Sequence, residues 1–392
     1  MTTFVNCTLF DGTNDQNTPN AWFTVDKTGR LTARGTGTPA DTENVVDLGG
    51  QYVMPGFLNV HTHVTADPQS FNGNYGQTEA EAAVFATQNL QTLLKSGVTF
   101  LRQCGTKYDV DVALKRMQAD GKLPHTPHFL TSGRAFTMTG GHGDGPHSGN
   151  LVDSPDEMRK AIRQAFKLGI DSVKVIATGG VMTPNDFMED PQLSTAEMHV
   201  AVEEAHHKRR VVAAHAEGNP GIQNALDAGV DSIEHGFYVT PEEAKQMAAQ
   251  NTYLTPTLIA EWVIPEYGKG KLPDWEVKKA ADALDDTYVN LTKAFHLGVN
   301  FTCGTDAGTP FNGFDLTPKE FGLLTRLGMT PAQAYQCSSL NSAQLLGVAD
   351  DYGTLEVGKF ADFQVLKNDP LADTANVVQA DKQVYLGGHR EF

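Results

Sequence analysis

Basic residues are scarce in this sequence relative to acidic ones. The 392-residue chain holds 30 Lys and Arg against 47 Asp and Glu, which gives a formal net charge of −17. Nucleic-acid binding depends on clustered Lys and Arg side chains that neutralise phosphates. We therefore expect no nucleic-acid partner, and a small molecule as the ligand.

Cysteine and long apolar runs are also scarce. The four cysteines, Cys7, Cys104, Cys303 and Cys337, are widely separated and show no CxxC spacing, which argues against a disulfide framework and a zinc ribbon. No run approaches the roughly 20 apolar residues that span a bilayer. No basic segment followed by an apolar one opens the chain, as it would in a secretory signal. These absences predict reduced thiols, no membrane partner and a cytoplasmic location.

Short apolar runs alternate with longer amphipathic segments through the middle of the chain. This pattern predicts parallel strands connected by helices. Strands are expected at 57–62, 98–104, 128–132, 172–178, 211–216, 232–236, 253–258 and 300–305. Helices are expected at 79–95, 155–168, 195–208 and 275–297, and Ser154-Pro-Asp-Glu157 predicts a capping box. Eight such strands predict an α/β fold, a closed (β/α)8 TIM barrel.

Both ends of the chain differ from the middle. Short runs at 3–9, 22–25 and 45–48 are divided by turn residues, without room for helices between them. The segments 353–366 and 382–386 repeat this pattern near the other end. We expect residues 1–55 and 350–392 to form a small β-sandwich domain beside a barrel domain of residues 56–349.

Potential ligands follow several of the expected strands. The first strand ends in His61-Thr-His63, and because side chains alternate along a strand, the two imidazoles point to the same side, as a metal site requires. Later strands hold or end in Lys174, His215, His235 and Asp306. The carboxyl ends of barrel strands meet at one face, so these six side chains are expected to converge.

Each of these residues has an ordinary structural alternative. A single histidine after an apolar run is commonly a packing or capping residue, and Asp306 could cap the turn that follows it. Lys174 lies within Ser172-Val-Lys-Val-Ile-Ala177, where a buried ammonium costs several kcal/mol unless it is compensated. A salt bridge is one compensation. The other is loss of the proton and reaction with carbon dioxide, which gives a carbamate able to bridge two divalent cations.

The motifs together resemble the amidohydrolase superfamily. They comprise Pro55-Gly-Phe-Leu-Asn-Val-His-Thr-His63, Lys174, His215, His235, Gly304-Thr-Asp306 and Gly353-Thr-Leu-Glu-Val-Gly-Lys-Phe-Ala-Asp362. Within the superfamily, Thr139-Gly-Gly-His-Gly-Asp144 and Ser232-Ile-Glu-His-Gly-Phe-Tyr238 are similar to metal-dependent dipeptidases and N-acyl amino acid hydrolases, including prolidases, a group related to the imidazolonepropionases.

The resemblance implies a role for each candidate residue. His61, His63 and Asp306 would bind the more buried of two divalent ions, expected to be zinc, and His215 and His235 the more exposed one. Carboxylated Lys174 and a hydroxide would bridge the ions. Asp306 would move the proton between the water and the leaving amine.

Two further residues are expected to act on the substrate. By the same resemblance His142 would contact the substrate, and Tyr238 would donate a hydrogen bond to the developing oxyanion. Their alternatives are a residue of a flexible loop for His142 and core packing for Tyr238. Gln103-Cys104 departs from relatives that carry an acidic residue after Arg102, so a supporting role of that strand stays open.

These features predict a binuclear metal-dependent amidohydrolase. Its substrates would be dipeptides, such as Xaa-Pro, or N-acyl amino acids, and we expect a homo-oligomer. The alternative is a mononuclear cyclic-amide hydrolase or deaminase of the imidazolonepropionase type, which Glu217 keeps open although Lys174 argues against it. An inactive scaffold would have lost a metal ligand, and all six are present.

Overall fold

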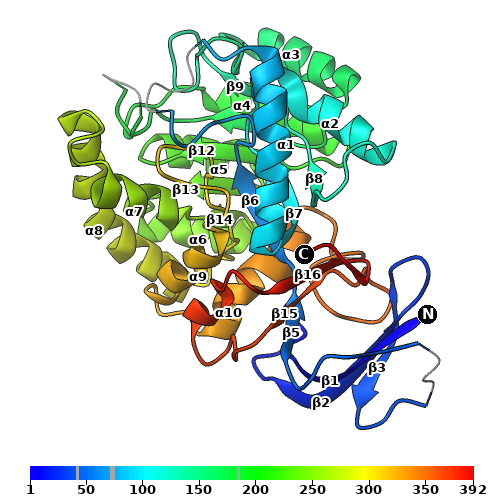
Figure 1. Ribbon diagram of the computed structural model, residues 1–392. Coiled ribbons are helices and arrows are strands. Elements are labelled where there is room, and N and C mark those ends of the chain that lie inside the picture. Colours follow the sequence, from blue (N-terminus) through cyan, green and yellow to red (C-terminus); the bar gives the residue numbers. More distant parts are fainter. Residues whose placement is uncertain (41–43, 71–75, 183–185) are drawn as a thin grey trace.

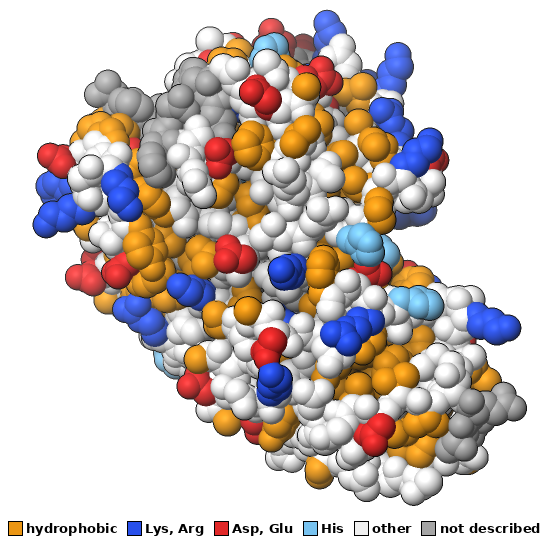
Figure 2. Space-filling view, in the orientation of Figure 1, with side chains coloured by type: hydrophobic (Ala, Val, Ile, Leu, Met, Phe, Trp, Pro, Cys, Tyr) orange, Lys and Arg blue, Asp and Glu red, His pale blue; other side chains and the backbone are white. Residues whose placement is uncertain are grey.

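Two strand-containing regions make up the computed structural model of the protein (Figure 1), which describes residues 1–40, 44–70, 76–182 and 186–392. The larger region combines parallel strands with helices that pack around them. The smaller region is a sheet that projects from it and contains the N-terminus. On the face seen in Figure 2, Lys and Arg side chains are scattered among acidic and apolar ones.

The parallel strands form two sheets. The three-stranded sheet has the order β6-β7-β8, and the six-stranded sheet has the order β10-β9-β11-β12-β13-β14. Every pairing within them is parallel. Their bounds are β6 (Phe57–Thr62), β7 (Val98–Gln103), β8 (His128–Leu130), β9 (Ala135–Thr137), β10 (Gly149–Leu151), β11 (Val173–Ile176), β12 (Val212–Ala216), β13 (Ser232–His235) and β14 (Tyr253–Thr255).

The expected strand at 300–305 is not a strand in the structure. Isolated parallel bridges join Leu254 to Phe301 and Thr62 to Ala307. The amide of Val60 also donates to the carbonyl of Cys303 at 2.8 Å, so this segment lies between β14 and β6. Its backbone switches partners along its length and turns at Asp306, which has a φ of 56°, so no continuous ladder forms.

Helices follow the parallel strands at the positions that the sequence patterns predict. Of the four predicted helices, α1 begins at 79, α3 covers 155–168, α4 begins at 195 and α8 ends one residue before 297. The bounds are α1 (Glu79–Ser96), η1 (Lys107–Asp109), α2 (Val110–Ala119), α3 (Pro155–Leu168), α4 (Thr195–His206), α5 (Gly221–Ala228), α6 (Pro241–Gln250), α7 (Leu258–Tyr267), α8 (Asp274–His296), α9 (Thr317–Thr325), α10 (Pro331–Gln336), η2 (Cys337–Asn341), α11 (Ser342–Leu345) and η3 (Thr374–Val377).

The capping box expected before α3 forms only in half. The Ser154 hydroxyl accepts from the amide of Glu157 at 3.3 Å. The Glu157 carboxylate accepts from the amide of Asp153 at 2.9 Å instead of from Ser154. The cap therefore reaches one residue further back than the motif predicts.

Strands from both ends of the chain form one mixed sheet. Its order is β17-β16-β15-β5-β1-β2-β3, and β4 pairs with β1. The bounds are β1 (Thr2–Leu9), β2 (Thr18–Val25), β3 (Leu31–Thr36), β4 (Val45–Asp47), β5 (Tyr52–Pro55), β15 (Phe363–Leu366), β16 (Gln383–Leu386) and β17 (His389–Arg390). The antiparallel pairing of β5 with β15 joins the strands from the two parts of the chain, and these two strands lie side by side in Figure 1. The strands that were expected to form a β-sandwich are hydrogen-bonded to one another in this single sheet.

Close packing joins the terminal sheet to the parallel strands. The left-handed Gly97 (φ 105°) ends α1, and a Cβ there would lie 2.1 Å from Oε1 of Gln364 in β15. The buried Lys382 donates to the carbonyls of Ser96 and Val377, just before β16. Among the helices in the described part of the chain, none is both long and apolar enough to cross a membrane.

Candidate metal centre and active-site cavity

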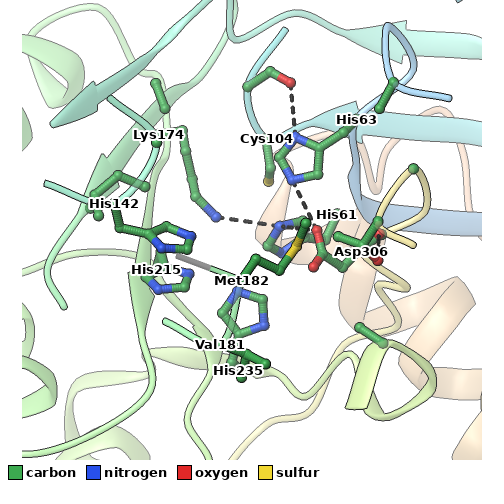
Figure 3. A pocket seen from close by; sticks show the side chains of 18 of the residues that line it. His61, His63, Cys104, His142, Lys174, Val181, Met182, His215, His235 and Asp306 are labelled. Atoms are coloured by element: carbon green, nitrogen blue, oxygen red, sulfur yellow. Dashed lines mark hydrogen bonds and ion pairs between the residues drawn. The ribbon is translucent and has the colours of Figure 1, made fainter. Parts of the chain in front are cut away.

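One cavity collects the residues that follow the parallel strands. It has a volume of about 280 Å³, near the lower end of the range of small-molecule sites. Seven of the sequence-predicted residues line it: His61, His63, His142, Lys174, His215, His235 and Asp306. Figure 3 shows Lys174 and Asp306 pointing toward His61 from opposite sides, with His215 and His235 below.

The first potential metal group consists of His61, His63 and Asp306, whose ligand atoms lie within 4.8 Å of one another. Asp306 Oδ1 lies 2.9 Å from His63 Nε2 and 3.4 Å from His61 Nε2. Nδ1 of His61 is 2.8 Å from a Glu234 oxygen, and Nδ1 of His63 is 2.9 Å from the Gly105 carbonyl. Because these acceptors hold the Nδ1 protons, both Nε2 atoms keep their lone pairs for a metal.

The second potential group contains His215, Glu217 and His235. Nδ1 of His235 is 2.7 Å from the Thr257 hydroxyl, so its Nε2 is available. His215 is held the other way, because its Nε2 lies 3.0 Å from the Gly179 carbonyl. A carbonyl oxygen only accepts hydrogen bonds, so Nε2 of His215 carries the proton and Nδ1 has the lone pair.

Lys174 lies beside the first potential metal group, and it lines the cavity that also contains the second group. Its Nζ is 3.4 Å from Nε2 of His61, and Lys174 is only 2% exposed. No carboxylate forms a salt bridge with it among the described residues. The salt bridge that was the ordinary alternative for this buried cation is therefore not seen there.

Burial keeps three of the histidine rings neutral. Desolvation lowers the pKa of His61, His215 and His235 well below the usual value, and the positive charge of Lys174 lowers each further. Desolvation alone would raise the pKa of Asp306, but the hydrogen bond with His63 and the nearby positive groups outweigh it and lower that pKa. Neutral imidazoles and an ionised carboxylate are the forms that bind metal ions.

Unusual backbone conformations aim two of these side chains. His235 and Asp306 have φ angles of 71° and 56°, which are sparsely populated for residues other than glycine. Gly304 allows the segment before Asp306 to approach β6, because a Cβ there would lie 2.7 Å from Cβ of His61 and 2.4 Å from Cγ2 of Thr255. The strained backbone at His235 and Asp306 directs the imidazole and the carboxylate toward the cavity, and the close approach that Gly304 allows helps to place the carboxylate of Asp306.

The two expected substrate residues are placed differently. His142 stacks on His215 with ring centroids 4.4 Å apart, and its Nδ1 is 3.0 Å from a carboxylate oxygen of Asp186 (Figure 3). Tyr238 is not among the residues that line the cavity, although its neighbour Phe237 is. Its amide donates to the carbonyl of Glu217 at 2.9 Å, and burial raises the pKa of its phenol to about 12.

The sequence did not reveal the groups that support the candidate ligands. Glu234, one residue before His235, accepts from the fully buried Arg102 at 2.7 Å and orients His61 with its other oxygen. An arginine within the apolar strand β7 is the same signal that singled out Lys174. Glu261 in α7 also lines the cavity, and its place within a helix gave no comparable signal.

A family model decides the relationship of this chain to known proteins. The model of the amidohydrolase family matches residues 52–389, which include every candidate ligand. The chain belongs to the amidohydrolase family. It is thus a hydrolase that acts on carbon–nitrogen bonds, and its fold is TIM-barrel-like.

Other amidohydrolases are similar along most of their length. Ochratoxinase of Aspergillus niger is 29% identical over 362 residues, which cover 85% of this chain and 73% of that protein. Imidazolonepropionase of Pseudomonas putida is 25% identical over 90% of this chain and 88% of that protein. The crystal structure of a Xaa-Pro dipeptidase with methionine bound in its active site superposes with a TM-score of 0.90, at 30% identity and 99% coverage of both chains.

Proposed function

We propose that this amidohydrolase is a binuclear metal-dependent enzyme that cleaves the amide bond of dipeptides or N-acyl amino acids. The observation that carries the proposal is the position of Lys174 beside one potential metal group, in a cavity that also contains the second. The similarity to a Xaa-Pro dipeptidase and to ochratoxinase supports an amide as the bond that is cleaved.

The donor set suits two divalent ions. His61, His63 and Asp306 would hold one, and His215 and His235 the other, with the carboxylated Lys174 between them. Neutral nitrogens and an ionised carboxylate are the donors that zinc takes, and each ring is fixed by a partner at its other nitrogen. Two metal ions held in this way would lower the pKa of a water molecule bound to them and would polarise the carbonyl group of the substrate.

Several residues of the chain would complete the reaction around the metal pair. Asp306 would accept the proton of the attacking water and return it to the leaving amine, because it is ionised and faces the cavity. His142, held by Asp186, would contact the substrate above His215. For Tyr238 we propose a role at the oxyanion that needs its side chain to turn toward the cavity.

The finer structural expectations belong to the same proposal. We propose that the six- and three-stranded sheets, joined by the segment at 300–307, represent a closed (β/α)8 barrel with its site at the carboxyl ends of the strands. The domain division into 56–349 and 1–55 plus 350–392 follows the two sheets. The homo-oligomeric state and the cytoplasmic location stay predictions.

Metal analysis tests the binuclear proposal directly. Protein loaded with zinc and freed of excess metal should contain close to two ions per chain, and a value near one would contradict the bridge. The loaded protein should hydrolyse members of a library of dipeptides and N-acyl amino acids. Loss of that activity on chelation, and its return with metal, would link the ions to the reaction.

A second candidate is a mononuclear enzyme that opens a cyclic amide or deaminates a heterocycle. It is favoured by the similarity to imidazolonepropionase and by the position of Glu217 beside His215 and His235. This candidate predicts one ion per chain and activity on cyclic amides, with none on the dipeptide library.

A further inference from the structure

Two buried carboxylates of the cavity have no part in the proposed mechanism. Glu217 follows β12, and Glu261 lies in the first turns of α7, so they reach the cavity from different elements. Both line it, and they are only 4% and 3% exposed. One oxygen of each, Oε2, has no hydrogen-bond partner among the described residues.

Unpaired buried carboxylates are costly. A buried carboxylate needs a cation or several donors to offset the loss of water. Neither residue forms a salt bridge with a Lys or Arg in the described part of the chain, although Lys279 is close enough to influence Glu217. Burial raises the pKa of Glu261 to about 8.

Glu217 is poorly placed to be a metal ligand. Its Oε1 lies 3.8 Å from Nε2 of His215, the nitrogen whose proton is held by the Gly179 carbonyl. The lone pair of His215 is on Nδ1, at the other side of the ring. A metal ion bound there would leave Glu217 on the proton-bearing side.

The cavity that both carboxylates line also has apolar side chains in its wall. Val181, Met182, Phe237, Ala260 and Ile264 line the same cavity, and Val181, Phe237 and Ile264 pack in one hydrophobic cluster. Apolar walls that end in carboxylates suit an aliphatic chain that carries a cation, because the methylenes contact the walls while the charge is paired.

We propose that Glu217 and Glu261 form an anionic subsite, which selects substrates with a positively charged ammonium or guanidinium group near the scissile amide. This inference rests on the proposed amide hydrolysis and names its substrate class. A cationic group would supply the donors that the two orphaned oxygens lack. A neutral substrate of the same size would leave both carboxylates unpaired.

Three substrates of nearly equal size test the subsite. L-lactoyl-L-norleucine has no cation, L-lactoyl-L-lysine carries one on the side chain of the leaving amino acid, and L-alanyl-L-norleucine carries one on the acyl side. At least one cationic substrate should have a kcat/KM about tenfold or more above that of the neutral one. Whichever cationic substrate is preferred shows whether the subsite binds a charge on the leaving amino acid or on the acyl side. Equal values for all three would overturn the subsite.

Matched variants assign the preference to the carboxylates. Glu217→Gln and Glu261→Gln should each lower the ratio of kcat/KM for the preferred cationic substrate to kcat/KM for the neutral one about tenfold or more. Glu266→Gln, an exposed residue of the same helix α7, should leave all three unchanged. An equal loss on all substrates, or loss of a metal ion from Glu217→Gln, would overturn the selective role.

A binding measurement separates this inference from the proposed reaction. n-Butylammonium should bind to the zinc-loaded protein more tightly than 1-butanol in calorimetry, and Glu261→Gln should remove the difference. If n-butylammonium binds more tightly but none of the three substrates is cleaved, amide hydrolysis is refuted and the subsite is supported. If the substrates are cleaved but no cation is preferred, in hydrolysis or in binding, the subsite is refuted and amide hydrolysis is supported.

Discussion

Asp306 has two proposed tasks at the scale of single residues, and Asn separates them. Asp306→Asn keeps an oxygen for the metal but cannot accept a proton, so kcat should fall about 10²- to 10⁴-fold while metal content stays near that of the wild type. Steady-state kinetics and metal analysis check the two parts. Asp315→Asn, at an exposed position that does not line the cavity, is the control. An active Asp306→Asn variant would exclude the proton transfer.

Substitutions of Lys174 distinguish a carbamate from a plain cation. Lys174→Ala should lose the bridge, with metal content falling below two ions per chain and activity falling with it. Lys174→Arg keeps the charge but forms no carbamate, so it should be as inactive as the alanine variant. Carbon-13 NMR of protein prepared with labelled bicarbonate should show the carbamate in the wild type alone. Full activity of either variant would refute the bridge.

The convergence of the candidate ligands could be predicted from the sequence, but the groups that orient them could not. His61, His63, Lys174 and Asp306 stand out because each follows or interrupts an apolar run. The partner of His61 is Glu234, which lies 173 residues away. The partners of His63 and His215 are backbone carbonyls, which every residue has. Only the folded chain shows which acceptors meet which rings.

At the scale of elements, helix α7 depends on a cap from a different helix. Its N-cap residue Thr257 makes no side-chain cap, and the buried Glu320 of α9 accepts instead from the amides of Leu258 and Ile259, both at 2.9 Å. Glu320→Gln keeps one acceptor and turns an NH2 group toward the other amide, so we expect a loss of about 1–3 kcal/mol in the free energy of unfolding. Denaturant unfolding measures it, with the exposed Glu266→Gln as the control.

The same residue gives the unfolding free energy a pH dependence of known sign. Burial raises the pKa of Glu320 to about 8, from 4.5. Between these values the folded state binds more protons than the unfolded state, so stability should fall as the pH rises from about 4.5 through about 8. In Glu320→Gln this part of the slope should be absent. A variant with the stability and pH profile of the wild type would contradict the cap.

Helices were easier to predict than strands for a local reason. The start of α3 is fixed by Ser154 and its neighbours, and caps of this kind can be read from a few consecutive residues. The segment at 300–305 has the composition of a strand, but its hydrogen bonds go to Leu254 on one side and to Val60 and His61 on the other. That division depends on tertiary packing, which composition does not determine.

At the scale of the whole molecule, distant parts of the chain meet in the terminal sheet and again in the cavity. The side chain of Gln364 donates to the carbonyl of Pro55 across 309 residues. The sequence indicates that both ends are β-structure, because turn residues divide short apolar runs there. It does not indicate the order of the strands, since many pairings would bury those runs equally well.

The candidate metal ligands come from segments between β6 and the loop at Asp306, so metal ions would hold much of the molecule together. Ions that bind only the folded state stabilise it by about 3–4 kcal/mol at 100 to 1,000 times their dissociation constant. Chelation should therefore lower the thermal unfolding temperature by several degrees, and added zinc should restore it. His61→Ala should start lower and respond less, whereas the exposed His389→Ala should respond as the wild type does. An unfolding temperature that stays constant while the metal content falls to zero would mean that the six residues are held in place by the fold alone, without a resident metal pair.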